Sequence, residues 1–423
     1  MSISSIMNVR CMKCKGRGFC GREFCPLILK SKSRIKLKKN INRNFNKDSF
    51  MSFTAAPFIG YKGYPELNVG LLSPPDRESL GITPELYDAP KDWSAKRFEI
   101  PQLVDIRSSL VNSRFMANIA DVRNKKPKDS RFMEFAQLSG IAAKPVDTEF
   151  SLKDRPRFTV KFDSTNSPMG PQAKLQKLSM VSNPRVAGRV DKVVSDTDLK
   201  AKDAVLYLHK HNHDENFLSK ALSTGNFGLG KNRKLVPTRW SITATDDLIG
   251  KDLINEIKQY PESDYLSFFG GYLGNYYLIM MFPEVWGYEL FETYMPKVSW
   301  NTTSEIQYTT DYEFYAGRKT YAENCAGGYY ATRLPILEKL SELKRQASCL
   351  VIRVITGEYS VPLGVWVVRQ ATRNALEQKP LEFGSKELML NYAKLLIRKK
   401  FGHDPAEILD KSHLLRQMAI QTK

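Results

Sequence analysis

The chain has 423 residues, of which 42% are hydrophobic and 11% aromatic, and its formal net charge is +19. This composition supplies enough apolar side chains for a packed interior, which excludes a mainly disordered protein, and the length predicts two or three domains or one large core with a small satellite. No window approaches the roughly 18 apolar residues of a transmembrane helix and no signal peptide is recognisable, so we expect a soluble cytoplasmic protein.

Four cysteines lie close together near the N-terminus. Cys11, Cys14, Cys20 and Cys25 are separated by two, five and four intervening residues. Four such thiolates can close around one tetrahedral Zn²⁺ and fill it, which leaves no open position for catalysis. We therefore expect a structural zinc module over residues 1–26. The alternative is that the cysteines are incidental to a flexible tail.

Positive charge is concentrated in the same part of the chain, because residues 1–50 contain 13 Lys or Arg and 2 acidic residues. This asymmetry favours an anionic partner, and nucleic acid is the leading candidate because each neutralised phosphate releases counterions. An acidic membrane surface and a solvated tail without a partner are the alternatives. We expect a basic linker over residues 27–51, and phosphate contacts from Arg17, Arg22, Lys30, Lys32, Arg34, Lys36, Lys38 and Lys39.

The next part of the chain, residues 52–190, begins with a stretch rich in Pro and Gly. This stretch, residues 52–90, predicts short strands and turns. A mainly polar stretch follows over residues 112–190, for which we expect a helix near residues 129–140 and loops elsewhere.

From residue 191 onward the apolar pattern is more regular. It predicts a strand end and a helix over residues 193–208, and further strands at residues 265–269, 276–282, 350–355 and 363–368. Helices are expected at residues 248–259, 335–346, 385–400 and 404–417, the last capped by Asp404. The irregular alternation of strands and helices predicts a mixed α/β or α+β fold, as a large globular domain beside the small zinc-binding module.

The densest polar stretch, residues 233–247, contains Arg239, Trp240, Asp246 and Asp247 without helical or strand periodicity. A loop of this composition often lines a cleft. Arg239 and Trp240 are suited to gripping a phosphate and stacking on a base, while the paired aspartates are suited to Mg²⁺ or to a catalytic base. The alternative is that Asp246 caps a following helix and forms an ordinary ion pair.

A second such stretch, residues 311–333, contains Arg318, two adjacent glycines, two adjacent tyrosines and Arg333. Gly327 and Gly328 precede a predicted helix, where backbone N–H groups bind anions. The alternative is a tight turn with aromatic packing. The catalytic residues stay unknown, and the candidates for a nucleotide pocket are Arg239, Asp246, Asp247, Arg318 and Arg333.

Several stretches together resemble the archaeal Nre family of DNA repair proteins, in its NreA type with an N-terminal zinc finger. These stretches are residues 58–70, 194–201, 233–243, 326–333 and 362–366, and the third reads Arg-Lys-Leu-Val-Pro-Thr-Arg-Trp-Ser-Ile-Thr. The resemblance implies a part in DNA damage repair in an archaeon, with an Nre core over residues 52–190 and 191–380 and C-terminal helices over residues 381–423. It supplies no catalytic residues.

The resemblance also concerns a partner. Family members often end in a short motif that docks on the sliding clamp, and Gln417 and Ile420 match its first two places. The aromatic anchors that follow in the motif are missing here, so we expect clamp binding to be weak or lost.

Three functions follow as hypotheses. The first is a DNA repair protein whose zinc module and basic linker bind the phosphates of DNA, with RNA as an open alternative. The second is an enzyme acting on a nucleotide or a modified base. The third is a scaffold that recruits repair or RNA-processing partners.

Overall fold

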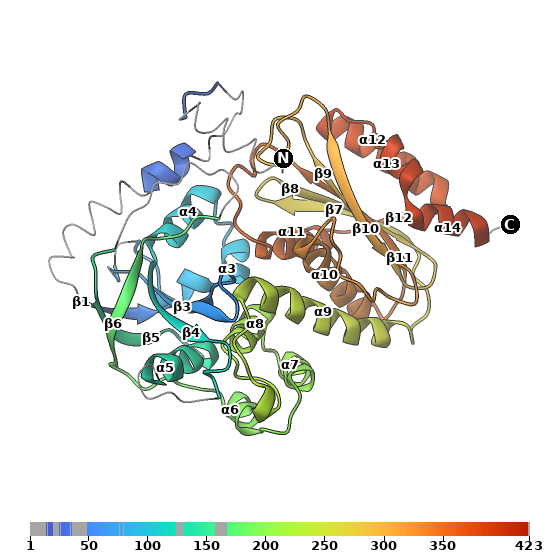
Figure 1. The fold of residues 1–423 in the computed structure, drawn as a ribbon. Coiled ribbons are helices and arrows are strands. Elements are labelled where there is room, and N and C mark those ends of the chain that lie inside the picture. The colour runs from blue at the N-terminus through green and yellow to red at the C-terminus, as the bar shows by residue number, and fades with distance from the viewer. Residues whose placement is uncertain are drawn as a thin grey trace. The chain divides into compact units, whose positions relative to one another are not determined.

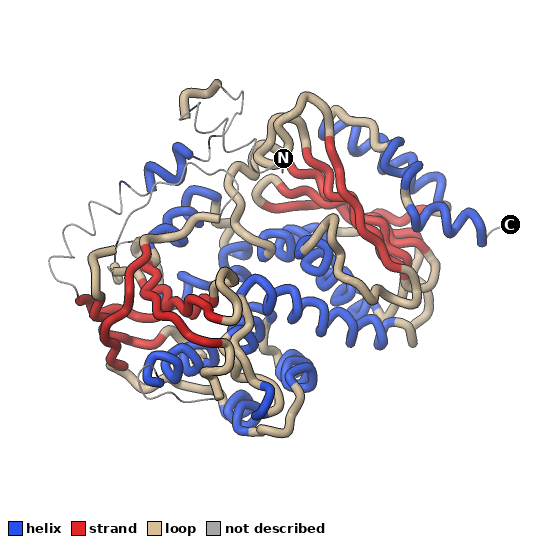
Figure 2. Tube along the Cα trace, in the orientation of Figure 1, coloured by secondary structure: helices blue, strands red, loops and turns tan. Residues whose placement is uncertain are grey.

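The structure is a computed structural model, and it describes residues 14, 16–19, 25, 27–33, 35, 49–75, 77–78, 80–123, 130–156 and 167–421. From residue 49 onward the chain forms two compact units that meet between Ile249 and Gly250, here named the N-terminal and the C-terminal unit. Each unit contains one six-stranded mixed sheet with helices, which confirms the predicted mixture of helices and strands (Figure 2).

The sheet of the N-terminal unit has the strand order β1-β5-β6-β4-β3-β2 (Figure 1). Its strands pair in antiparallel fashion except for β4 and β6, which are parallel. The strands are β1 (Ser49–Thr54), β2 (Ala56–Ile59), β3 (Glu66–Ser73), β4 (Val111–Asn118), β5 (Val146–Leu152) and β6 (Gln172–Met180).

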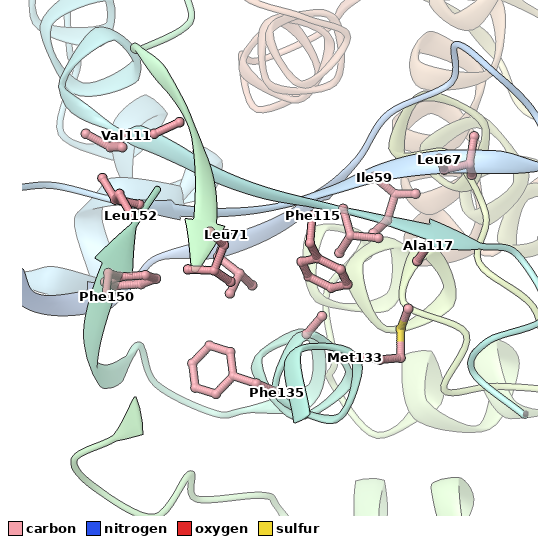
Figure 3. Close-up of a cluster of buried hydrophobic side chains, with 14 of the residues drawn as sticks. Ile59, Leu67, Leu71, Val111, Phe115, Ala117, Met133, Phe135, Phe150 and Leu152 are labelled. Atoms are coloured by element: carbon pink, nitrogen blue, oxygen red, sulfur yellow. The ribbon is translucent and has the colours of Figure 1, made fainter. Parts of the chain in front are cut away.

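One face of this sheet forms the core of the N-terminal unit. Every second residue of β3 and β4 is buried, and all of these residues except two serines are apolar, which is the period of a strand with one covered face. Helix α5 (Ser130–Ile141) covers that face with Met133 and Phe135 (Figure 3). The hydrophobic effect acting on this cluster fixes the register of the strands, because a slip by one residue would turn the apolar side chains to the other face.

The remaining helices of this unit are short and complete its surface. They are η1 (Pro84–Asp88), α3 (Pro90–Ala95), α4 (Ile100–Ser109), α6 (Gly188–Ser195), α7 (Ala201–Lys210), α8 (Glu215–Ser223) and η2 (Gly230–Asn232). Asp88 ties three of them together, since its carboxylate lies 2.9 Å from Lys220 Nζ and 4.0 Å from Arg107. The long helix α9 (Thr238–Ile257) contains the boundary between the two units.

The sheet of the C-terminal unit has the order β10-β9-β11-β8-β7-β12, with β9 and β11 as its parallel pair. All eight residues of β11 are buried, as expected for a central strand covered on both faces. The strands are β7 (Tyr265–Tyr272), β8 (Asn275–Phe282), β9 (Gly287–Tyr294), β10 (Gln307–Glu313), β11 (Ser348–Ile355) and β12 (Leu381–Phe383).

Helices cover both faces of this second sheet (Figure 1). Helices α10 (Gly327–Leu343) and α11 (Trp366–Leu376) lie on one side. Helices α12 (Lys386–Phe401), α13 (Ala406–Lys411) and α14 (His413–Gln421) lie on the other, packed on an apolar cluster from β8, β9 and β11. A carboxylate of the sheet fixes α14, because Glu289 accepts hydrogen bonds from the backbone N–H groups of His413 and Leu414 at 3.1 and 3.0 Å.

Many of the predicted elements are confirmed. The strands and turns expected over residues 52–90 are β1 to β3, and the helix expected near residues 129–140 is α5. Strands β7, β8 and β11 and helix α12 also lie where the apolar pattern predicts them. Ser385 caps α12, accepting a hydrogen bond from the Leu388 N–H at 3.3 Å.

Other predictions are wrong. The expected loops between residues 112 and 190 contain β4, β5 and β6, because lysines on the outer side of β6 mask its alternating apolar residues. Within residues 193–208 the predicted helix is α7, but the end of α6 stands where a strand end was expected, and residues 366–368 begin α11 instead of ending a strand. The predicted last helix is divided into α13 and α14 at Ser412, and α10 begins eight residues earlier than predicted, with Pro335 inside it.

Among the residues that the structure describes, no helix combines the length and the apolar character needed to cross a lipid bilayer.

Candidate nucleic-acid interface

Two segments far apart in the sequence meet at one end of the N-terminal sheet. The turn between β2 and β3 holds Tyr61 and Tyr64, and the first turn of α9 holds Arg239 and Trp240. The backbone N–H of Ile59 donates a hydrogen bond of 2.8 Å to Thr238 Oγ1, so the end of β2 and the start of α9 are joined directly.

The approach to α9 is also fixed. The Leu235 N–H donates to the Ile119 carbonyl at 2.9 Å, and the Val236 N–H donates to the Ser223 carbonyl at 2.9 Å. The start of α9 is thereby anchored to the end of β4 and to the end of α8. Side chains on it are presented from a rigid support, as a binding site requires.

The four side chains form two contacting pairs from the same two segments, here named the aromatic patch and defined as Tyr61, Tyr64, Arg239 and Trp240. The Arg239 guanidinium lies 4.8 Å from the centre of the Tyr61 ring. The Tyr64 and Trp240 rings are 5.9 Å apart between centroids and inclined by 46°. This geometry is typical of cation–π and aromatic contacts that hold rings in place without covering them.

The rings of the patch are exposed. Tyr61, Tyr64 and Trp240 are 45%, 48% and 47% exposed, whereas Trp93 and Trp286 are fully buried. Among the residues that the structure describes, no carboxylate forms an ion pair with Arg239. Exposed aromatic rings beside an uncompensated cation match the requirements of a surface that stacks bases and contacts phosphates.

The two aspartates proposed beside Arg239 do not line a loop. The helix already begins at Thr238, so Asp246 lies in its interior, and neither a loop nor an N-cap describes it. Asp246 is buried and Asp247 is half-buried. The sequence prediction of a polar loop over residues 233–247 therefore holds only as far as Pro237.

Arg318 is held by the chain itself. Its guanidinium lies 2.9 Å from the Asp311 carboxylate and donates hydrogen bonds to the carbonyls of Tyr312, Thr320 and Tyr321. These partners use most of the N–H donors of the guanidinium group. Asp311 also accepts from the Cys325 N–H at 2.8 Å, so the pair fixes the loop before α10.

Arg333 is buried inside the C-terminal unit. It is 1% exposed, forms a 2.8 Å ion pair with the fully buried Glu313, and lies over the rings of Tyr329 and Tyr330. A phosphate could reach this guanidinium only by displacing Glu313. The aromatic packing that the sequence left as an alternative is what the structure contains here.

The glycines at the start of α10 are likewise approached by a carboxylate of the chain. A Cβ built on Gly328 would come within 2.3 Å of Glu292 Oε1. Glu292 in turn forms a buried ion pair with Arg353. The positive end of the helix dipole is thus balanced internally, in the place where the sequence predicts an external anion.

The two cysteines outside the N-terminal cluster are buried. Cys325 lies near Thr309, with their side-chain S and O atoms 3.7 Å apart, and Cys349 lies in the central strand β11. Burial raises the pKa of both thiols well above its ordinary value. Neither thiol is therefore suited to act as a nucleophile.

Only part of the predicted N-terminal site lies within the described residues. Cys14 is buried and Cys25 half-buried, whereas Cys11 and Cys20 lie outside the described residues. Across the part of the chain that the structure describes, no cluster of three or more metal-binding side chains occurs. The zinc module stays a prediction.

Of the residues predicted to contact phosphates, only some lie within the described residues. Arg17 and Lys32 are exposed, but Lys30 is buried, against the expectation of a solvent-facing side chain. Lys30 and Lys32 belong to a helical stretch over residues 27–33. The other five predicted contacts lie outside the described residues: Arg22, Arg34, Lys36, Lys38 and Lys39.

The residues of the predicted clamp motif lie on α14. Gln417 lines a cavity of about 20 Å³ together with residues such as Trp286, and Ile420 is exposed. These positions do not test clamp binding, so its weakness or loss stays a prediction.

Sequence reasoning found Arg239 and Trp240 but missed Tyr61 and Tyr64. A signal was present, because the turn Gly-Tyr-Lys-Gly-Tyr-Pro places two aromatic residues between two strands, where a short turn cannot bury them. Their position beside Arg239 depends on a contact between segments that are almost 180 residues apart, as the Ile59–Thr238 hydrogen bond shows.

Comparison with known proteins identifies the relatives of this chain. Residues 19–301 match the family model described as archaeal Nre, N-terminal, and residues 313–423 match archaeal Nre, C-terminal. No solved structure matches the chain.

Three curated proteins are similar over most of their length. DNA repair protein NreB of Archaeoglobus fulgidus is 34% identical, covering 96% of this chain and 97% of its own. DNA repair protein NreA of the same organism is 35% identical, covering 93% and 95%. DNA repair protein NreA of Haloferax volcanii is 32% identical over 76% of each chain. The chain thus belongs to the archaeal Nre family.

Proposed function

We propose that this protein acts in DNA repair by binding nucleic acid. Two observations support the proposal. The relatives named above are DNA repair proteins, and the aromatic patch offers exposed rings beside an exposed guanidinium. The patch is the observation that carries the binding function, because exposed aromatic side chains have a stability cost that a ligand can offset.

The N-terminal segment supplies the second part of the proposal. Cys11, Cys14, Cys20 and Cys25 would hold one structural Zn²⁺, since four thiolates are the donor set that a closed zinc site uses. The neighbouring lysines and arginines would contact phosphates without reading sequence. Their contribution would weaken as salt concentration rises, because it depends on the release of counterions.

Fluorescence anisotropy with labelled oligonucleotides tests the binding function. We expect binding at low ionic strength that weakens steeply with added salt. The triple variant Lys36→Gln, Lys38→Gln, Lys39→Gln should lower the slope of log K against log salt by roughly 2 to 3. Lys202→Gln, an exposed lysine on α7, is the matched control and should change the slope by less than about 1.

Elemental analysis tests the zinc module separately. We expect about one equivalent of zinc per chain. The double variant Cys11→Ser, Cys14→Ser should contain none, whereas Cys349→Ser should keep the full content, because Cys349 is buried in β11. Zinc-free wild-type protein would contradict the module, and wild-type protein that binds no oligonucleotide at low salt would contradict the function.

A further inference from the structure

The sheet of the N-terminal unit carries a second set of ligand-compatible residues on the face opposite its core. Residues paired across neighbouring strands point to the same face of a sheet. Val69 and Phe115 are paired and lie in the core, so the next pair along the strands, Asn68 and Met116, lies on the opposite face. Met116 is 51% exposed there, and Asn68 is half-buried.

The next set of residues paired across the strands on this face contains two basic side chains. Gly70 pairs with Arg114, and Arg114 pairs with Lys174 on β6. Arg114 is half-buried and Lys174 is exposed. Within the part of the chain that the structure describes, no carboxylate forms an ion pair with either side chain. The face therefore offers two cations that are available to an anionic ligand.

Gly70 keeps the middle of this face flat. A Cβ at Gly70 would come within 1.9 Å of Asn112 Oδ1, so a larger side chain at this point would have to displace the Asn112 side chain. We name the residues Asn68, Met116, Arg114 and Lys174 the sheet strip. A flat strip that joins exposed rings to a half-buried and an exposed cation suits an extended chain better than a compact ligand.

The sheet strip lies next to the turn that carries the tyrosines of the aromatic patch. Gly60, the residue before Tyr61, pairs with Asn68, since its N–H donates a 2.8 Å hydrogen bond to the Asn68 carbonyl. Successive rows on one face are about 7 Å apart and neighbouring strands about 4.8 Å apart, so the distance from the turn to Lys174 is on the order of 15 to 20 Å. That length accommodates a few nucleotides.

Charge complementarity indicates the class of ligand. The patch and the strip together carry the cations Arg239, Arg114 and Lys174, and Lys62 lies in the same turn as the tyrosines of the patch. The acidic residue nearest to them along the turn, Glu66, is engaged by Asn118, whose side-chain amide donates to it at 2.6 Å. The surplus of positive charge favours a polyanion, and the exposed rings favour one whose bases are free to stack.

We propose that the aromatic patch and the sheet strip bind single-stranded or unpaired nucleic acid. Bases would stack on Tyr64 and Trp240, and the phosphate backbone would follow Arg114 and Lys174. Bases inside a duplex stack on each other and offer no free face, so the rings would not engage paired DNA. This inference rests on the proposed function and adds the strand state of the ligand.

Anisotropy measurements with one sequence in single-stranded form, in duplex form and in a duplex with an unpaired loop test the inference. We expect single-stranded and looped ligands to bind at least tenfold more tightly than the duplex. Tyr64→Ala and Trp240→Ala should each weaken single-strand binding about 5- to 100-fold and duplex binding less than about 2-fold. The matched control is Tyr315→Ala, which removes a tyrosine that is 46% exposed and lies under a lysine in the C-terminal unit, and it should change neither.

Tryptophan fluorescence gives a readout that a loss of folding would not mimic. Of the five tryptophans in the chain, Trp240 is the exposed one, while the others are buried or half-buried. Stacking of a base on Trp240 should quench part of the emission when single-stranded ligand is added. Trp240→Phe should retain most of the affinity and lose the quenching.

The sheet strip is tested through its charges. Arg114→Gln and Lys174→Gln should each lower the salt slope of single-strand binding by about 0.7, the contribution of one phosphate contact. Lys202→Gln should leave that slope unchanged.

The outcomes separate the two proposals. Binding without preference for unpaired strands, with the patch variants behaving as wild type, would overturn the inference and leave the proposed function to the basic N-terminal segment. An equal loss of duplex and single-strand binding in Trp240→Ala would also overturn it. Wild-type protein that binds no nucleic acid at low salt would overturn the proposed function itself.

Discussion

Arg239 and Arg333 have the same kind of neighbours and opposite environments. Each guanidinium lies over a tyrosine ring, at 4.8 Å for Arg239 and at 5.4 and 5.6 Å for Arg333. Arg239 is exposed, and no carboxylate among the described residues pairs with it. Arg333 is buried, and Glu313 neutralises its charge at 2.8 Å.

The difference shows that an arginine beside aromatic residues has no single meaning in a sequence. In the C-terminal unit the cluster is part of the interior, where an ion pair avoids the cost of burying an isolated charge. In the N-terminal unit the cluster faces water, and its charge and rings are available to a ligand. Four predictions test this contrast, and they are given in order of expected effect.

The largest effect should come from breaking the buried pair. Arg333→Met leaves the Glu313 carboxylate buried without its cation, and we expect the free energy of unfolding to fall by about 3 to 5 kcal/mol. Urea denaturation measures this loss. The double variant with Glu313→Gln should regain much of the stability, because no buried charge is then left alone.

Arg345→Met, which removes an exposed arginine of the same unit, should change the stability by less than about 0.5 kcal/mol. If Arg333→Met were equally mild, the contrast between the two clusters would be lost.

A smaller effect should follow from crowding the start of α10. Gly328→Ala places a methyl group within 2.3 Å of Glu292 Oε1 and must displace that carboxylate from its pairing with Arg353. We expect a loss of about 1 to 3 kcal/mol in thermal or urea unfolding. Gly384→Ala, where a Cβ meets no atom within 4 Å, is the control and should be close to neutral. A neutral Gly328→Ala would mean that Glu292 does not occupy the helix start.

The third prediction concerns a buried charge in the N-terminal unit. Burial raises the pKa of Asp88, but Lys220 and Arg107 outweigh burial, and the net pKa of Asp88 is lower than its ordinary value. A lowered carboxyl pKa contributes stability that is complete above about pH 4 to 5 and is lost as the pH falls through the folded-state value.

Asp88→Asn should therefore cost about 1 to 2 kcal/mol at pH 7, and the difference from wild type should shrink below about pH 4. Unfolding curves measured from pH 3 to pH 7 check this. A difference independent of pH would show that packing of the side chain, and not its charge, is responsible.

The smallest effect should distinguish stacking from charge in the aromatic patch. Arg239→Lys keeps the charge but loses the planar group over Tyr61, and we expect single-strand binding to weaken about 2- to 5-fold with unchanged stability. Anisotropy and thermal unfolding measure the two quantities. If Arg239→Lys bound as wild type while Arg239→Gln did not, Arg239 would act through charge alone.

The fold was predictable where the apolar pattern is strong and local. Strands β7, β8 and β11 consist mainly of apolar residues, and Ser385 precedes α12 as a typical cap. Strands β9 and β10 were missed because they carry Glu289, Glu292, Asp311 and Glu313, which resemble exposed polar residues in a sequence. Glu292 and Glu313 pair with Arg353 and Arg333, and Glu289 binds the start of α14, so these partners lie 20 or more residues away and only the folded chain brings them together.

The candidate site was half predictable for the same reason. Arg239 and Trp240 are adjacent in the sequence, so their combination was visible. Whether Arg318 and Arg333 are available to a ligand depends on Asp311 and Glu313, and the sequence shows these carboxylates without showing the pairing. Composition indicates which groups are present, and burial decides which of them can meet a ligand.

The burial of Cys325 and Cys349 has a practical consequence. Thiol reagents attack the thiolate, and burial with a raised pKa makes both sulfurs slow to react in the native protein. A colorimetric thiol titration without denaturant should thus report on the N-terminal cysteines alone. Adding a chelator during such a titration would reveal whether a metal shields them, before any variant is made.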